Sequence, residues 1–181
     1  MSNAAEIQAL AQEIEEKKKQ LAELRRQNNE PVKDYVLDTA TGPKPLSSFF
    51  EDKDELVVVH NMGRGCNYCS LWADGLTGFT HHIQTRAGFV LVSADPAERV
   101  SQTAEKRGWN FPVASNGESG FAHDMGFFKE EGPWPGISVF TRKDGQIYRH
   151  GYSELGPGDE FCSIWGIWDL FPNGDGGWEP K

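Results

Sequence analysis

The chain begins with a segment whose few hydrophobic residues recur at helical spacing. From Ala4 to Asn28 nearly every residue is a strong helix former, and the first helix breaker is Pro31. Its apolar residues fill the a and d positions of three heptads, except that Lys17 occupies one d position: Ile7, Leu10, Ile14, Leu21 and Leu24. Residues 1–30 are therefore predicted to form an amphipathic helix, which either dimerises as a coiled coil or lies against its own domain.

After Pro31 the pattern changes to short β-rich runs that alternate with helical windows. Such alternation predicts an α/β fold, a central mixed sheet with helices on its faces. The apolar run from Glu55 to His60 is continuous, which is typical of a strand buried on both faces. We assign residues 31–172 to one domain and expect the glycine-rich residues 173–181 to be a loose tail.

The remaining predicted elements follow from turn residues and capping signals. They are a hairpin of 35–37 about the turn at 41–43, a helical turn at 47–50, a helix at 66–85, a strand at 89–93, a helix capped by Asp95, a strand at 111–114, a helical stretch at 121–127, a hairpin of 137–140 with 147–150, and a closing helix at 159–170.

Charge and composition narrow the class of protein. A net charge of −9 over 181 residues disfavours a nucleic-acid partner, and no apolar run is long enough for a signal peptide or a membrane span. Three cysteines do not make the dense, even set of a secreted disulfide scaffold. We expect a soluble, cytoplasmic protein without a nucleic-acid or membrane partner.

Two of the cysteines form the motif Cys66-Asn67-Tyr68-Cys69, between the predicted central strand and the helix after it. Unpaired N–H groups and the positive end of the dipole at a helix start favour a thiolate there. Cys69 lies three residues on, and so on the same face, where it can attack a mixed disulfide on Cys66. Cys66 is thus the candidate nucleophile and Cys69 the resolving thiol. Arg64 can add a cation nearby or serve only solubility.

The alternative for this motif is half of a zinc site completed by His81 and His82. Adjacent histidines on a helix point about 100° apart, and the chain has no second C-x-x-C. We therefore expect neither a metal nor another cofactor.

Several segments resemble a thioredoxin-like family of unknown function described as predicted dithiol-disulfide oxidoreductases. The matching segments are Lys33–Val36, Val58–Met62, Cys66–Gly75, Val92–Pro96, Gly108–Pro112 and Gly136–Phe140. The resemblance spans about residues 31–172, is most specific in the C-x-x-C-S-x-W-A-D-G block, and leaves the N-terminal helix outside. It implies a thioredoxin-like fold of the peroxiredoxin-related branch. Asn67 stands where the family often has proline, which leaves the redox potential and thiol pKa open.

The resemblance to thioredoxins also suggests further site residues. His60 aligns with a buried carboxylate that relays protons to the resolving cysteine, so it is a candidate base, or else a strand-end histidine satisfied by the backbone. Pro135 has the spacing of the cis-proline that faces the dithiol, although an ordinary trans proline is equally compatible. With Trp134 it is a candidate for substrate contact. Trp72 can touch substrate or simply pack.

Three functions are compatible with these residues. The first is a thiol-disulfide oxidoreductase that acts on a protein or small-molecule disulfide or thiol and exchanges electrons with a cellular thiol reductant. The second is a peroxiredoxin-like thiol peroxidase, although Val59 and Gly63 replace the Pro and Thr of the motif P-x-x-x-T-x-x-C. The third is a binding module with an idle dithiol that forms a homodimer through the N-terminal helix.

Overall fold

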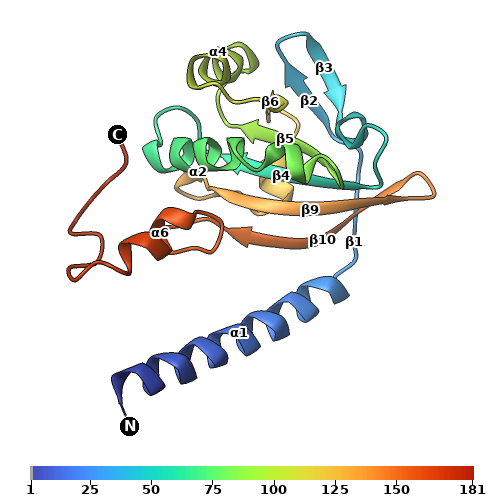
Figure 1. Ribbon diagram of the computed structural model, residues 1–181. Helices are drawn as coiled ribbons and strands as arrows, with labels where there is room; N and C mark the ends of the chain where they lie inside the picture. The colour runs from blue at the N-terminus through green and yellow to red at the C-terminus, as the bar shows by residue number, and fades with distance from the viewer. Residues whose placement is uncertain (1) are drawn as a thin grey trace.

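A computed structural model of the protein describes residues 2–181 and has a twisted sheet of eight strands at its centre (Figure 1). The strand order is β1-β10-β9-β4-β5-β6-β2-β3. β4, β5 and β6 run parallel to one another, and β9 joins β4 antiparallel, so the sheet is mixed as predicted. The strands of this sheet are β1 (Glu30–Val32), β2 (Val36–Thr39), β3 (Gly42–Pro45), β4 (Glu55–Asn61), β5 (Gly88–Ser93), β6 (Val113–Ser115), β9 (Gly136–Lys143) and β10 (Gln146–Glu154). β7 (Phe128–Lys129) and β8 (Gly132–Pro133) form a separate pair.

Helices cover both faces of the sheet. The helical elements are α1 (Asn3–Gln27), the 3-10 turn η1 (Leu46–Phe50), α2 (Asn67–Thr77), α3 (Thr80–Ile83), α4 (Ala97–Arg107), α5 (Phe121–Asp124) and α6 (Ser163–Trp168). α2 and α4 pack on one face, while η1 and α5 pack on the other. The α/β class and the added N-terminal helix are thereby confirmed. No helix within residues 2–181 is both long and apolar enough to cross a membrane.

The alternation of side chains along β5 shows how the sheet separates two cores. Phe89 and Leu91 pack with α2 and α4, whereas Val90 and Val92 pack with η1 and α5. Both sets are buried, which explains why the strand is apolar throughout. The side chains of β4 alternate in the same way: Val59 packs with α2 and α4, whereas Val58 packs with η1 and α5.

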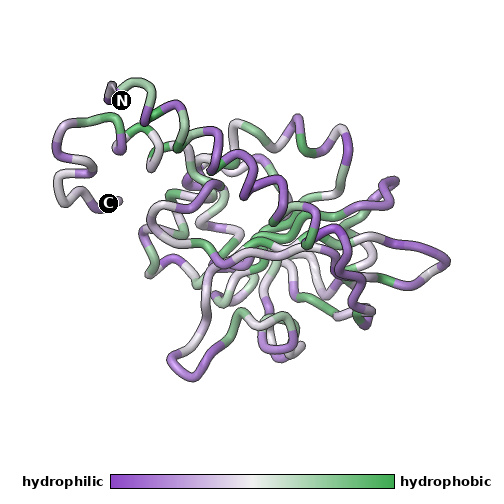
Figure 2. The backbone as a smooth tube through the Cα atoms, turned by 90° about the horizontal axis from the view of Figure 1, so that it is seen from below, coloured by the Kyte–Doolittle hydropathy of each residue, from purple (hydrophilic) through white to green (hydrophobic). Residues whose placement is uncertain are grey.

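α1 lies outside this core and has no buried residue (Figures 1 and 2). It contacts its own domain through charge, because Lys18 and Arg25 lie 3.5 and 3.4 Å from the carboxylate of Glu160. Its five heptad-position apolar side chains are 44–65% exposed. The helix therefore does not bury its apolar stripe on its own domain, which was one of the two sequence-based alternatives.

Several element boundaries differ from the sequence-based prediction. The helix expected over 66–85 stops at Thr77 and restarts as the short α3, with Gly78 between them. Asp95 does not cap α4, because the N-cap of that helix is Pro96. The Asp95 carboxylate instead accepts a hydrogen bond from the backbone N–H of Arg64 at 2.7 Å. The closing helix is only six residues long, since Asp159 accepts backbone N–H groups in the preceding loop.

The C-terminal residues are not the loose tail that the glycines predicted. The Trp178 ring packs against Trp165 and Trp168, with centroids 6.3 and 5.6 Å apart. The carbonyl of Pro180 accepts a hydrogen bond from the Asn67 side chain at 3.1 Å. The tail therefore packs beside α6 and the first residue of α2.

Candidate active site

The dithiol lies where the chain leaves the central strand β4 and starts α2. Cys66 is the N-cap of α2, and its sulfur accepts the backbone N–H of Cys69 at 3.1 Å. The preceding loop is fixed by Asn61, whose side-chain oxygen accepts the N–H of Gly63 at 2.8 Å. Gly63 has a φ of +103°, a conformation that favours glycine. Strand end, loop and helix start thus hold the two cysteines in one helical turn.

The two sulfurs differ in acidity. Hydrogen bonding from the Cys69 side chain, together with the N–H groups of Cys69 and Tyr68, lowers the pKa of Cys66 to about 6, although burial opposes the shift. The pKa of Cys69 is raised, first by its hydrogen bond to Cys66 and then by burial. Cys66 is half-buried, whereas Cys69 is buried. These shifts favour the thiolate at Cys66 and the protonated thiol at Cys69, the difference in acidity expected of a nucleophile and a resolving residue.

This difference predicts the pH dependence of Cys66 alkylation. Because its pKa is lowered, the thiolate fraction rises through pH 6, so the rate with iodoacetamide should increase with a midpoint near pH 6 and level off above pH 7. Cys69→Ala removes the largest cause and should move the midpoint upward by more than one pH unit. Rates measured by intact mass test this. A wild-type midpoint close to 8.5, the ordinary thiol value, would contradict it.

An aromatic cluster surrounds the buried side of the dithiol. Cys69 and Trp72 pack with Leu155, Cys162 and Trp165. Trp72 is only 3% exposed, so it packs as a core residue and does not offer the substrate surface that was one of its predicted roles. Burial raises the pKa of Cys162, which keeps this third thiol protonated.

His60 does not reach the dithiol, which corrects its assignment as a candidate base. Its Nε2 lies 3.0 Å from the Ser138 hydroxyl, and its ring stacks on Phe127 with centroids 4.0 Å apart. These partners belong to the η1 and α5 face, opposite α2. Burial lowers the pKa of His60 to about 3, so the ring is neutral and structural.

The loop before β9 also differs from one prediction. No peptide bond within residues 2–181 is cis, so the bond before Pro135 is trans. The Pro135 carbonyl accepts the N–H of Leu155 at 3.1 Å, and Leu155 packs in the cluster around Cys69. Trp134 points elsewhere: its indole N–H donates to Glu154, and Lys129 covers its ring at 4.1 Å. The structure thus relates Pro135 indirectly to the dithiol and gives Trp134 a structural partner.

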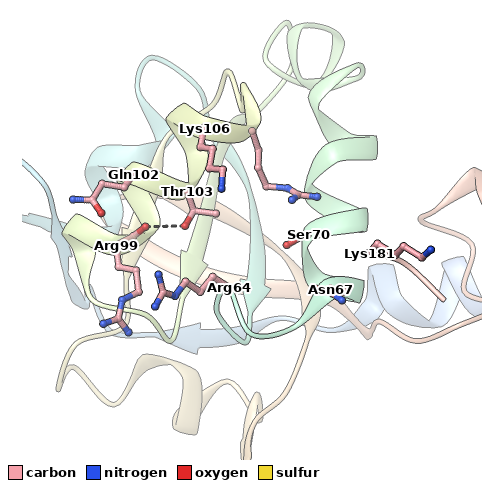
Figure 3. A pocket seen from close by; sticks show the side chains of 9 residues that line it. Arg64, Asn67, Ser70, Arg99, Gln102, Thr103, Lys106 and Lys181 are labelled. Carbon is pink, nitrogen blue, oxygen red and sulfur yellow. Dashed lines mark hydrogen bonds between the residues drawn. The ribbon is translucent and has the colours of Figure 1, made fainter.

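A cavity of about 330 Å³ lies between α2 and α4, next to the first turn of α2 (Figure 3). It is lined by Arg64, Asn67, Ser70, Arg99, Gln102, Thr103, Lys106, Arg107 and Lys181. Of these, only Arg64 was a candidate site residue from the sequence. The recurrence of Arg99, Lys106 and Arg107 on one helix was a signal, but nothing in the sequence places them beside the cysteines.

Asp74, a residue of the resembling block, joins α2 to α4. Its carboxylate accepts two hydrogen bonds from Arg107, at 3.0 and 2.6 Å, and one from the Trp109 indole at 2.8 Å. These bonds fix the spacing of the two helices on either side of the cavity. Asp74 is therefore a positioning residue.

The two histidines of the zinc alternative lie on a different helix from the cysteines. His81 and His82 lie on α3, beyond the break in the helix, and both side chains are exposed. Among residues 2–181 no group of three or more His, Cys, Asp or Glu side chains is placed to hold a metal ion.

Comparison with solved structures identifies the fold. Peroxidoxin BcpB of Mycobacterium tuberculosis is 19% identical, with a TM-score of 0.61 over 70% of this chain and 84% of that one. Peroxiredoxin Q of Xanthomonas campestris is 14% identical, with a TM-score of 0.60 over 74% and 89%. A hypothetical protein of Sinorhizobium meliloti is 17% identical, with a TM-score of 0.54 over 85% and 87%. At these identities the likeness shows the fold alone, which is that of the thioredoxin-like peroxiredoxins.

Comparison by sequence gives one match. A family model described as "Bacterial protein of unknown function (DUF899)" matches residues 2–178. The match includes α1, which the resemblance had left outside. No curated protein matches the chain.

Proposed function

We propose a function for this chain, which belongs to the bacterial family of unknown function DUF899, from the residues of its site. The proposed function is that of a thiol-disulfide oxidoreductase that uses the Cys66–Cys69 dithiol. The observation that supports this most directly is the unequal pair: a half-buried Cys66 with a pKa of about 6 beside a buried, protonated Cys69. A structural pair of thiols has no need of such a difference in acidity.

The first proposed step is attack by the Cys66 thiolate on a disulfide of a protein or small molecule. A bond forms between Cys66 and one substrate sulfur, and the other substrate sulfur leaves as a thiolate that takes a proton from water. The N–H groups of Cys69 and Tyr68 hold the attacking thiolate at the helix start.

The second step is attack by Cys69 on the Cys66 sulfur. While Cys66 is a thiolate, its hydrogen bond is the largest cause that raises the Cys69 pKa. Formation of the mixed disulfide removes that charge, so Cys69 becomes easier to deprotonate without help from His60. Cys69 loses its proton to water, its thiolate attacks to form the Cys66–Cys69 disulfide, and the second substrate sulfur leaves as a thiolate that takes up a proton. The substrate thereby gains two electrons. A cellular thiol reductant then returns two electrons to the protein by reducing the Cys66–Cys69 disulfide.

Peroxide reduction is the second candidate, favoured by the peroxiredoxin names of the structural neighbours. Against it stand Val59, a buried core residue, and Gly63, where the peroxidase motif has Pro and Thr. Rates of reduced protein with hydrogen peroxide and with a small disulfide, measured side by side, test the choice. A faster disulfide reaction supports the oxidoreductase. A peroxide rate that exceeds it by orders of magnitude would establish the peroxidase.

We further propose that α1 pairs with α1 of a second copy, because its apolar stripe is exposed on the chain itself. Light scattering should then give about twice the 20.2 kDa chain mass. The double substitution Ile14→Asp and Leu21→Asp should halve that mass, while Gln12→Asp, on the polar side of the heptads, should not. A wild-type protein that is monomeric at micromolar concentration would contradict this pairing.

A further inference from the structure

The cavity beside the dithiol is basic, although the chain has a net charge of −9. It is lined by the cationic residues Arg64, Arg99, Lys106, Arg107 and Lys181. Figure 3 shows Arg64, Arg99 and Lys106 on one side of the space and Ser70 on the other. Cations that meet from separate segments at one cavity provide the field that binds an anion.

Not all of these charges are neutralised by the protein. Arg107 is paired with Asp74, and Arg99 lies 3.4 Å from Asp95. Arg64 and Lys106 have no carboxylate within 4.0 Å in the part of the chain that the structure describes. Lys106 also complements the dipole at the end of α4, but that role does not explain why Arg64 faces the same space from the loop before the dithiol.

Neither cysteine lines the cavity, but the residue after each of them does. Asn67 follows Cys66 and Ser70 follows Cys69, and both line the cavity. Ser70 is only 7% exposed, and its hydroxyl points from α2 toward the cavity (Figure 3). A volume of about 330 Å³ is at the lower end of sites for small molecules, roughly 300–1,000 Å³, and too small for a folded partner.

From this juxtaposition we infer that the substrate of the dithiol is an anionic small-molecule disulfide, whose carboxylate or phosphate groups bind in the cavity while its sulfur meets Cys66. The inference rests on the proposed function and specifies its substrate class. Arg64 and Lys106 bind the acidic groups, and Ser70 donates a hydrogen bond to one of them. The redox step is the one given above, with both electrons passing to this disulfide.

The test compares the rates at which reduced protein reacts with three disulfides of different charge. These are dithiobis(nitrobenzoate), which is anionic, dithiodipyridine, which is neutral, and cystamine, which is cationic. In the double variant Arg64→Glu and Lys106→Glu, the rate with the anionic disulfide should fall at least tenfold, and the rate with the neutral one should change less than twofold. Lys143→Glu, at the distant hairpin of β9 and β10, is the control and should change none of them.

The neutral disulfide separates binding from reactivity. If the double variant slows all three probes equally, the cations act on the Cys66 thiolate, and the inference is overturned. It is overturned equally if none of the rates changes. If even the wild-type protein reacts with none of the probes, the proposed function itself fails, which is a distinguishable outcome.

Calorimetry on Cys66→Ser, which binds without reacting, distinguishes the two sources of negative charge. Tighter binding of coenzyme A disulfide than of glutathione disulfide assigns the site to phosphate groups, and the reverse assigns it to carboxylates. Failure of both to bind at millimolar concentration contradicts the inference.

Discussion

Cys66→Ser is expected to abolish disulfide exchange, lowering its rate at neutral pH by roughly a thousandfold or more, because a serine hydroxyl is not ionised there. Cys69→Ser leaves the nucleophile in place but removes the resolving thiol. This variant should accumulate a stable mixed disulfide on Cys66, visible in the intact mass as the added half of the substrate.

Cys162→Ser is the matched control for both variants. Cys162 packs in the same cluster as Cys69, but its pKa is raised by burial, so its loss should leave the exchange rate within about twofold. A mixed disulfide that forms on Cys162, or a Cys66→Ser variant with substantial activity, would contradict the assignment of roles.

The second large effect concerns stability. Gly88 opens β5 where η1 crosses it, and a Cβ placed there would overlap the carbonyl oxygen of Phe49 and lie 2.9 Å from the Cα of Phe50. Both are backbone atoms, which cannot rotate away. Gly88→Ala should therefore lower the free energy of unfolding by about 3 kcal/mol or more. Urea unfolding followed by circular dichroism measures this change.

Gly75→Ala provides the comparison. Gly75 lies within α2, and a Cβ there meets nothing within 4 Å. Alanine removes the entropic cost of glycine in a helix, so this variant should gain about 0.5–1 kcal/mol. A Gly88→Ala protein as stable as wild type would show that η1 does not pack on β5 as described.

Local patterns predicted the fold well where one segment determines its own structure. The continuous apolar run at Glu55–His60 is β4, and the predicted hairpin of 137–140 with 147–150 is the antiparallel pair β9 and β10. Local patterns gave wrong predictions where a contact with a residue distant in sequence determines the structure. Asp95 has the chemistry of a helix cap, but the Arg64 N–H takes its carboxylate. Likewise, the glycines of the tail did not reveal that Trp178 packs on α6.

The same distinction holds for the candidate site. The lowered pKa of Cys66 follows from local chain geometry, since the Cys69 side chain lies one turn away and the helix start supplies N–H donors. His60 shares a face of β4 with Val58, but the sequence does not say which face α2 covers, and this decides against a role at the dithiol. The basic cavity needs Arg64 and Lys106 in one place, and only the packing of α4 beside α2 provides that.

The most direct test of the central claim is a glutathione redox titration of the purified protein, with thiols counted by intact mass. We predict a reversible loss of two mass units on oxidation, midway at one defined potential, that disappears in both Cys66→Ser and Cys69→Ser and persists in Cys162→Ser. Thiols that stay reduced across the whole range, or a two-unit change that survives in either of the first two variants, would contradict a Cys66–Cys69 redox couple.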